Sequence, residues 1–258
     1  MKGKLLRKMI VTDLDGTLLK NDKSLSRYTI DVIEKLRGRG HKFVVATARP
    51  FRAVKKFMNS VNYDAGIYHN GSLIYMDGKE VDDFKINNVK EIIDKILSRY
   101  PESLIAAEVE DVLYSNFDAD LFWPGTGFVY TDSNFFELKE KKADKVIVMV
   151  SSLEDMKKYD KLLPSELYIQ LSEERIGMIM NKNATKSNGI KFLAEKYDID
   201  IGDIISFGDD YNDVDMIKFC GTGVCVLNAV DEVKKFANQI CDTNENDGVA
   251  KWIDEFIL

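Results

Sequence analysis

Met9–Leu19 have the sequence MIVTDLDGTLL, and this stretch decides the fold of the chain. Its first four residues, Met9–Thr12, form a short run that is apolar and rich in β-branched side chains, which is typical of a buried strand in a parallel sheet. The run ends at Asp13 and Asp15, and Gly16 allows the backbone to turn sharply. We therefore predict a strand that ends in an acidic turn.

Strands and helices alternate on the C-terminal side of this turn. Ser26 is a typical helix N-cap, and apolar residues at helical spacing follow it. A second buried strand is expected at 42–46, a helix after Pro50 and a third strand at 66–69. This order implies right-handed crossovers and a doubly wound α/β sheet.

The pattern changes in the middle third of the chain. Two short strands, 72–76 and 80–84, flank an Asp77-Gly78 turn and predict a hairpin. Helices at 89–97 and 153–163 are then expected among several short strands (104–108, 112–116, 145–150, 167–171 and 176–180). Such a mixture is typical of a separate α+β unit. After Thr185, strands at 203–207 and 222–227 alternate again with helices.

We therefore divide the chain into three segments. Residues 1–81 and 183–258 form the two parts of one α/β core, and residues 82–182 form an inserted α+β domain. The insert carries an aromatic cluster in its sequence, formed by Phe117, Phe122, Trp123, Phe128 and Tyr130. Packing in the core of the insert is the first interpretation of this cluster. Contact with a substrate's leaving group is the alternative.

The composition excludes several classes of function. The chain has 258 residues and a formal net charge of -7, which argues against a nucleic-acid binder because such proteins present a basic face. No window approaches the ~20 apolar residues of a membrane span. The three cysteines, Cys220, Cys225 and Cys241, show no metal-binding or disulfide pattern. We expect a cytoplasmic protein that is a monomer or a weak homo-oligomer and binds neither nucleic acid nor membrane.

Polar residues collect where three expected strands end. Asp13–Thr17 follow the first strand, Thr47–Arg49 follow the second, and Asp209–Asp213 follow a late one, while Lys186 begins a helix. In an open α/β sheet, ligands bind beyond the carboxyl ends of the strands. A set of oxygen ligands of this kind suits Mg²⁺. A hydroxyl at Thr47 and a cation at Lys186 suit phosphate oxygens.

Simpler interpretations exist for each residue taken alone. Asp13 and Asp15 could form only an acidic turn after a strand. Asp209 and Asp213 could be acidic residues at a helix N-terminus that do no more than interact favourably with the helix dipole. This role is compatible with metal binding. Thr47 could cap a strand, and Lys186 could be a surface lysine.

Four segments in combination resemble a known superfamily. They are DLDGTLL (13–19), Thr47 at a strand end, Lys186 before a helix, and GDDYND (208–213), and together they resemble the four motifs of the haloacid dehalogenase (HAD) superfamily. Asn70-Gly71 and the size and position of the insert resemble the Cof-type branch, subfamily IIB, with a C2B cap. The resemblance covers essentially the whole chain. It implies a Rossmann-like doubly wound parallel-sheet core with an inserted α+β cap.

The resemblance also implies roles for individual residues. Asp13 would attack phosphorus and form an aspartyl-phosphate, and Asp15 would act as acid and base. Mg²⁺ would be held by the Asp13 side chain, the Asp15 backbone carbonyl and Asp209, with Asp213 in or next to the metal shell. The residues that would bind phosphate or substrate are Thr47, Ala48, Arg49, Lys186 and Asn212. Asp210 is not assigned as a ligand.

The implied activity is a Mg²⁺-dependent phosphatase that hydrolyses small phosphorylated metabolites, with sugar phosphates first. Asp15 argues against the dehalogenase branch, which lacks an aspartate two residues after the nucleophile. A phosphomutase on the same core is the first alternative. A non-catalytic protein that binds a phosphorylated ligand is the second, but it would be expected to lack one or more of Asp13, Asp15, Lys186 and Asp209.

Overall fold

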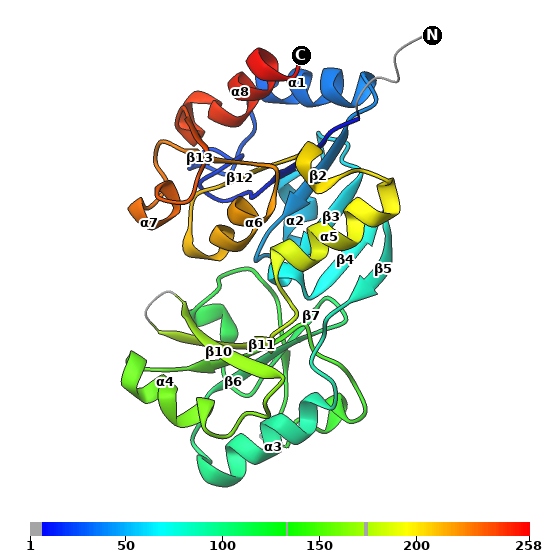
Figure 1. Ribbon diagram of the computed structural model, residues 1–258. Helices are drawn as coiled ribbons and strands as arrows, with labels where there is room; N and C mark the ends of the chain where they lie inside the picture. The colour runs from blue at the N-terminus through cyan, green and yellow to red at the C-terminus, as the bar shows by residue number, and fades with distance from the viewer. Residues whose placement is uncertain (1–6, 133, 173–174) are drawn as a thin grey trace. The chain divides into compact units, whose positions relative to one another are not determined.

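The structure, a computed structural model, describes residues 7–132, 134–172 and 175–258. The chain divides into two compact units (Figure 1). One contains the residues up to Asp83 together with Thr185–Leu258, and the other contains Phe84–Ala184. These limits lie two residues beyond those expected from the sequence. Among the described residues, no helix is both long and apolar enough to cross a membrane.

The first unit, called the core unit below, is built on a sheet of eight strands within the described residues. In spatial order the strands are β14 (Gln239–Cys241), β13 (Thr222–Val226), β12 (Ile204–Gly208), β1 (Met9–Thr12), β2 (Lys42–Ala46), β3 (Ala65–Tyr68), β4 (Leu73–Met76) and β5 (Lys79–Asp83). Neighbouring strands from β14 to β3 are parallel, whereas β4 and β5 are antiparallel. The predicted mixed α/β fold with a parallel-sheet core is confirmed.

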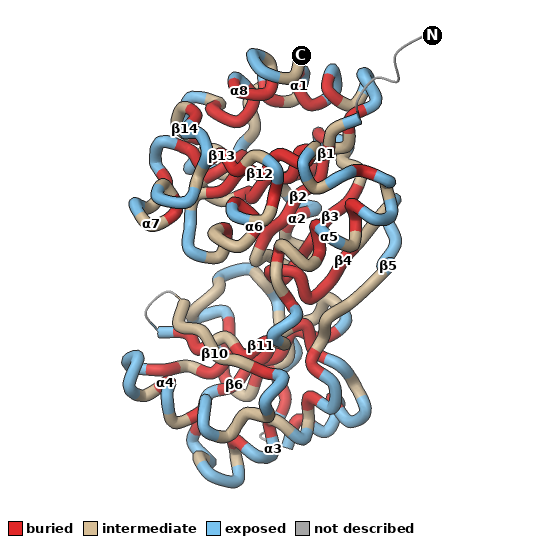
Figure 2. Tube along the Cα trace, in the orientation of Figure 1, coloured by how far each residue is buried: buried red, intermediate tan, exposed pale blue. Residues whose placement is uncertain are grey.

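Helices cover both faces of this sheet. The helices of the unit are α1 (Arg27–Gly38), α2 (Phe51–Phe57), α5 (Lys186–Tyr197), α6 (Val214–Phe219), α7 (Asp231–Lys234) and α8 (Gly248–Phe256). Helices α1 and α8 pack beside each other and share an apolar cluster with Phe43 and Phe207. On the opposite face, Ser206 Oγ donates to the Met216 carbonyl of α6 at 3.1 Å. The central strands are consequently buried (Figure 2).

The predicted hairpin extends the core sheet. Met76 pairs with Lys79, and between them Asp77 and Gly78 both have positive φ, at 51° and 76°. Two consecutive positive φ values define the tight turn that the Asp-Gly pair predicts. The hairpin strands therefore lie at the edge of the parallel sheet, next to β3, and precede the insert.

The second unit, called the insert unit below, contains a sheet of six strands in the part of the chain that the structure describes. Their spatial order is β10 (Leu167–Ser172), β11 (Ile176–Asn181), β9 (Lys145–Met149), β6 (Ile105–Val109), β7 (Val112–Ser115) and β8 (Val129–Tyr130). Helices α3 (Val89–Arg99) and α4 (Leu153–Asp160) contribute to one apolar cluster of this unit. Phe117, Phe122, Trp123 and Phe128 belong to another. Phe117 is buried there and the other three are half-buried against it, so packing in the core of the insert holds for these four aromatic residues. Tyr130 is 63% exposed and does not share this packing.

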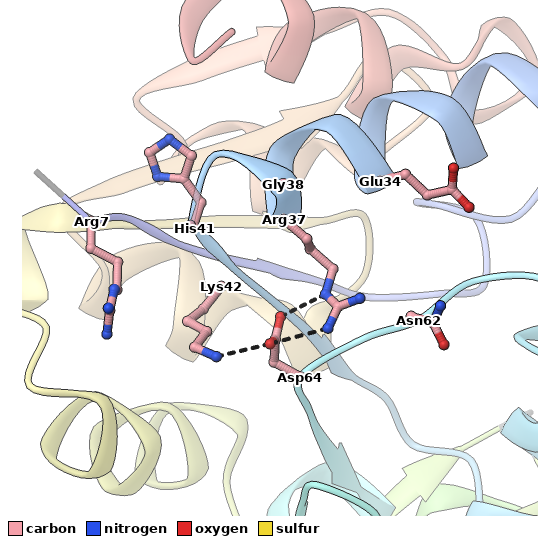
Figure 3. A pocket seen from close by; sticks show the side chains of 9 residues that line it. Arg7, Glu34, Arg37, Gly38, His41, Lys42, Asn62 and Asp64 are labelled. Atoms are coloured by element: carbon pink, nitrogen blue, oxygen red, sulfur yellow. Dashed lines mark hydrogen bonds and ion pairs between the residues drawn. The ribbon is translucent and has the colours of Figure 1, made fainter. Parts of the chain in front are cut away.

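A pocket lies at the amino end of β2 in the core unit (Figure 3). Its volume is about 520 Å³, and Asp64 is one of its lining residues. The Asp64 carboxylate accepts hydrogen bonds from Arg37 Nε at 2.9 Å, Lys42 Nζ at 2.9 Å and the Phe43 amide at 3.0 Å. These bonds tie the end of α1 to the start of β2. Thr47 follows the other end of β2, so this pocket is separate from the residues predicted to act on phosphate.

Candidate active site

Asp13 and Asp15 lie at the carboxyl end of the central strand β1. The Asp13 amide donates to the Phe207 carbonyl of β12 at 2.9 Å, which fixes the start of the acidic turn against the neighbouring strand. Asp13 is buried, whereas the Asp15 side chain is about one third exposed. Two carboxylates two residues apart therefore experience different environments.

A buried lysine joins two of the predicted aspartates. Lys186, the first residue of α5, places Nζ 2.7 Å from Asp13 Oδ1 and 2.6 Å from Asp213 Oδ1. Its side chain is fully buried. Burial alone would lower the pKa of Lys186, but the charges of Asp13 and Asp213 outweigh burial and raise it. Lys186 therefore carries its charge at neutral pH, and its burial excludes the interpretation as a surface lysine.

Asp209, which follows the end of β12, is the third carboxylate of an acidic group with Asp13 and Asp213. Asp13, Asp209 and Asp213 each offer a carboxylate oxygen, and these three atoms lie within 4.8 Å of one another. Burial raises the pKa of Asp209 to about 7, and the nearby charge of Asp213 adds to this effect. Burial likewise raises the pKa of Asp13 well above its usual range, against the opposing effect of Lys186. The three carboxylates and one lysine carry more negative than positive charge when ionised.

Thr17 and Gly16 hold Asp209 in place. Thr17 Oγ1 donates to Asp209 Oδ1 at 2.6 Å. Gly16 has φ of +79°, and a Cβ added to it would lie 2.4 Å from Asp209 Oδ2. A side chain at position 16 would therefore displace the carboxylate, and the turn conformation itself favours glycine.

Asp213 is anchored more firmly than Asp209. Its Oδ2 accepts from the backbone amides of Asp209 at 2.9 Å and Asp210 at 3.2 Å, while its Oδ1 accepts from Lys186. Asp210 caps the short helix Tyr211–Asp213 through a hydrogen bond from the Tyr211 amide at 2.8 Å. Asp210 is exposed, so its contacts are those of a helix cap.

Two cations contact the exposed carboxylate of Asp15. Arg49 Nε lies 2.5 Å from Asp15 Oδ2, and Arg49 Nη2 lies 2.7 Å from Oδ1. Lys23 Nζ donates to Oδ1 at 2.6 Å. Burial alone would raise the pKa of Asp15, but the hydrogen bonds from Arg49 and Lys23 outweigh burial and lower it. Asp15 is thus ionised while both cations contact it.

The remaining predicted residues lie at the same edge of the sheet. Thr47 is buried, and its Oγ1 accepts from the Arg49 amide at 3.2 Å. Ala48 lies between these two residues in the chain. Asn212 Nδ2 donates to Asn70 Oδ1 at 3.0 Å. The hydrogen bonds of the site thus link Lys186 to Asp13 and Asp213, Arg49 to Asp15, and Asn212 to Asn70.

The sequence did not single out Thr17, Lys23 or the Asn70 side chain as parts of this site. Thr17 stands inside the DLDGT segment, and Asn70 stands in the Asn70-Gly71 pair, so each had a signal in the sequence. Asn70 adopts φ of 56°, a left-handed conformation that asparagine tolerates. Lys23 is an ordinary loop lysine by composition and carried no signal.

Comparison with known proteins places the chain in a family. A family model described as haloacid dehalogenase-like hydrolase matches residues 10–253. The 5-amino-6-(5-phospho-D-ribitylamino)uracil phosphatase of Bacillus subtilis is 28% identical over 262 residues, covering 96% of this chain and 97% of that protein.

Solved structures agree with this placement. A phosphatase of the haloalkanoate (HAD) superfamily from Bacteroides thetaiotaomicron superimposes with a TM-score of 0.84 at 26% identity, covering 99% of this chain and 97% of that chain. The HAD subclass IIB sugar phosphatase BT4131 shares the fold, with a TM-score of 0.79 at 20% identity over 96% of this chain and 98% of that chain. The resemblance to the Cof-type branch and the predicted hydrolase class are confirmed, and the chain belongs to the haloacid dehalogenase-like hydrolase family.

Proposed function

We propose that this protein is a Mg²⁺-dependent phosphatase of small phosphorylated metabolites, acting through an aspartyl-phosphate on Asp13. The observation that carries the proposal is the group formed by Asp13, Lys186, Asp209 and Asp213 at the carboxyl ends of β1 and β12, with Asp15 two residues from Asp13. Such a group combines a buried nucleophile, a fixed cation and oxygen ligands. These are the parts that phosphoryl transfer requires, because the protein mainly positions groups and neutralises charge.

The acidic group fits a Mg²⁺ ion. Mg²⁺ prefers oxygen ligands and is usually held by one or two carboxylates together with water. Asp13 and Asp209 are the natural direct ligands, along with the Asp15 carbonyl. Both oxygens of Asp213 already accept hydrogen bonds, so Asp213 supports the site from beside the metal. When bound, Mg²⁺ would offset the repulsion between the carboxylates and the phosphate.

Asp13 is the nucleophile in this proposal. Its carboxylate oxygen forms a bond to phosphorus while the bond from phosphorus to the ester oxygen breaks. Lys186, held at 2.7 Å, stabilises the ionised carboxylate before attack. Lys186 and the Thr47 hydroxyl then hold phosphoryl oxygens, with Asn212 and the Ala48–Arg49 segment as further contacts.

Asp15 carries the proton. Asp15 must hold a proton when the ester binds, which requires its carboxylate to be released from the hydrogen bonds of Arg49 and Lys23 that keep it ionised. The protonated Asp15 then gives this proton to the departing ester oxygen, so the leaving group departs as an alcohol. In the second step Asp15 takes a proton from the water that attacks the phosphorus of the aspartyl-phosphate, which frees Asp13 and releases inorganic phosphate. The two steps leave Asp13 and Asp15 as they began.

Sugar phosphates are the first substrates to test. Two comparisons support this choice: one relative is named for a substrate with a phosphorylated ribityl chain, and one structural neighbour is titled a sugar phosphatase. We place the enzyme in the cytoplasm as a monomer or weak homo-oligomer. The three cysteines, which are free and buried, support a reducing compartment.

The test is phosphate release from a panel of phosphate esters with Mg²⁺, measured for the wild type, Asp13→Asn and Asp15→Asn. We expect Asp13→Asn to lose activity on all esters, and Asp15→Asn to lose most activity on alkyl esters, whose leaving oxygen needs a proton. Equal activity of wild type and Asp13→Asn would refute the proposal. With a hexose phosphate, isomer formation in excess of phosphate release would instead identify a phosphomutase.

A further inference from the structure

The loop after the acidic turn directs Lys23 to Asp15. In this loop the Lys20 amide donates to the Ser24 carbonyl at 3.1 Å, and the Lys23 amide donates to the Lys20 carbonyl at 2.9 Å. Lys23 itself has a backbone φ of +66°, a left-handed conformation that residues other than glycine and asparagine rarely adopt. Residues retained in such conformations concentrate at functional sites.

Lys23 is a second cation on a carboxylate that already has one. Arg49 contacts both oxygens of Asp15, which is the complete bidentate arrangement for a carboxylate. Lys23 shares Oδ1 with Arg49 and leaves its other N–H donors available for further acceptors. The three side chains together carry one excess positive charge. The Lys23 side chain is 39% exposed, so a substrate can reach it.

We infer that Lys23 is a specificity-determining residue that selects substrates with an anionic group close to the ester oxygen. This inference rests on the proposed function, because it takes Asp15 as the group that contacts the leaving oxygen. The favoured substrates are phosphorylated acids, including sugar acids, and sugars with a second phosphate near the first.

The distances define where that anionic group must be. A hydrogen bond between Asp15 and the leaving oxygen has a length of about 2.7 Å. Lys23 Nζ lies 2.6 Å from Asp15 Oδ1, so it comes within about 5 Å of a leaving oxygen that is bonded to this same oxygen. A carboxylate attached to the ester carbon, or to the carbon next to it, spans this gap. A carboxylate several carbons further away is not held next to Lys23 Nζ by this geometry, so it does not gain the same ionic interaction.

Two esters that differ only in this group provide the test. 2-Phosphoglycerate carries a carboxylate on the ester carbon, where glycerol 2-phosphate carries a hydroxymethyl group. The measured quantity is the ratio of their kcat/KM values with Mg²⁺. We expect Lys23→Met to lower this ratio about fivefold, the size of an exposed charge pair, and Lys23→Arg to retain most of it.

Lys20→Met is the matched control. Lys20 is in the same loop, but its Nζ donates to the Glu245 carbonyl at 2.8 Å and pairs with Asp247 at 3.8 Å. It should leave the ratio unchanged. If turnover of the pair is slow, their inhibition constants against p-nitrophenyl phosphate provide the same ratio.

Failure of the inference differs from failure of the proposed function. If Asp13→Asn is inactive and Lys23→Met keeps the wild-type ratio, the specificity role of Lys23 is wrong and the phosphatase proposal stands. An equal fall in the ratio for Lys20→Met would also overturn it, since the effect would then be one of general charge. A wild-type protein without Mg²⁺-dependent activity on p-nitrophenyl phosphate or either ester would overturn both.

Discussion

Replacing Lys186 by methionine removes the cation that lies between Asp13 and Asp213. Methionine has a similar length and is apolar, so the change removes the charge and retains much of the packing volume. The two carboxylates are 2.7 and 2.6 Å from Nζ in the wild type and are buried themselves. In the variant no cation lies between them, and Asp213 keeps only the hydrogen bonds from the amides of Asp209 and Asp210.

The expected loss of unfolding free energy is large. Removing one member of a buried ion pair costs about 3–5 kcal/mol, because the remaining charge stays buried and uncompensated. Here two carboxylates lose the same partner, and Asp209 offers a third carboxylate oxygen within 4.8 Å of theirs. We therefore expect a loss near the upper limit, about 5 kcal/mol, in metal-free protein at neutral pH.

The loss should depend on pH in a defined direction. Burial and nearby negative charge raise the folded-state pKa of Asp13 and Asp209, so the ionised forms of these two groups destabilise the folded variant. As the pH falls, these groups take up protons, and the loss should shrink. Wild-type Lys186, whose pKa is raised in the folded state, keeps its stabilising charge throughout this range.

Urea denaturation with EDTA at pH 8 and pH 5, for wild type and Lys186→Met, measures this effect. Added Mg²⁺ should restore part of the stability at pH 8, because an ion that binds only the folded state stabilises it. Lys157→Met is the control: this exposed lysine pairs with Glu154 on the surface of α4 and should change little. A loss below about 1 kcal/mol at pH 8 would refute the assignment of Lys186 as the buried partner of both carboxylates.

Two further predictions concern the metal site. Burial raises the pKa of Asp209 to about 7, so this proposed ligand takes up a proton as the pH falls through that region. Mg²⁺ affinity measured by calorimetry should therefore fall by up to about tenfold from pH 7 to pH 6. An affinity that does not change over this range would contradict the proposal that Asp209 is a ligand. Gly16→Ala should weaken Mg²⁺ binding, since its Cβ would lie 2.4 Å from Asp209 Oδ2. Gly40→Ala is the control, because Gly40 has a similar φ of +87° but no atom within 4 Å of an added Cβ. This variant should strain the backbone and leave Mg²⁺ affinity unchanged. An equal loss of Mg²⁺ affinity in Gly16→Ala and Gly40→Ala would contradict the steric argument.

Much of the fold followed from periodicity in the sequence. The buried strands Met9–Thr12 and Lys42–Ala46 are continuous apolar runs, and each begins and ends where the pattern predicts. Strands β8 and β14 were not predicted. β8 has two residues and β14 has three, so neither strand is long enough to show an alternation of apolar and polar residues. Their pairing depends on the neighbouring strand.

The site was predictable where chemistry requires a particular residue type. Asp13, Lys186 and Asp213 were expected from their motifs, and the structure brings the three together. The hydrogen bond of Thr17 to Asp209 joins residues 192 positions apart, and no local pattern encodes it. The approach of Lys23 to Asp15 depends on one left-handed residue in a loop. Contacts of these kinds come from tertiary geometry, which a single sequence does not show.

The position of the insert has a consequence for synthesis on the ribosome. Strand β1 pairs with β2 on one side and with β12 on the other, and β12 begins at Ile204, 192 residues after Thr12. At about 5–20 residues per second, translation of that stretch takes roughly 10–40 s. During this time one edge of β1 has no native partner, and an unpaired apolar edge can template association with other chains. The central strand of the finished sheet is therefore a temporary edge in the nascent chain, and arrest of translation before β12 should produce fragments that aggregate.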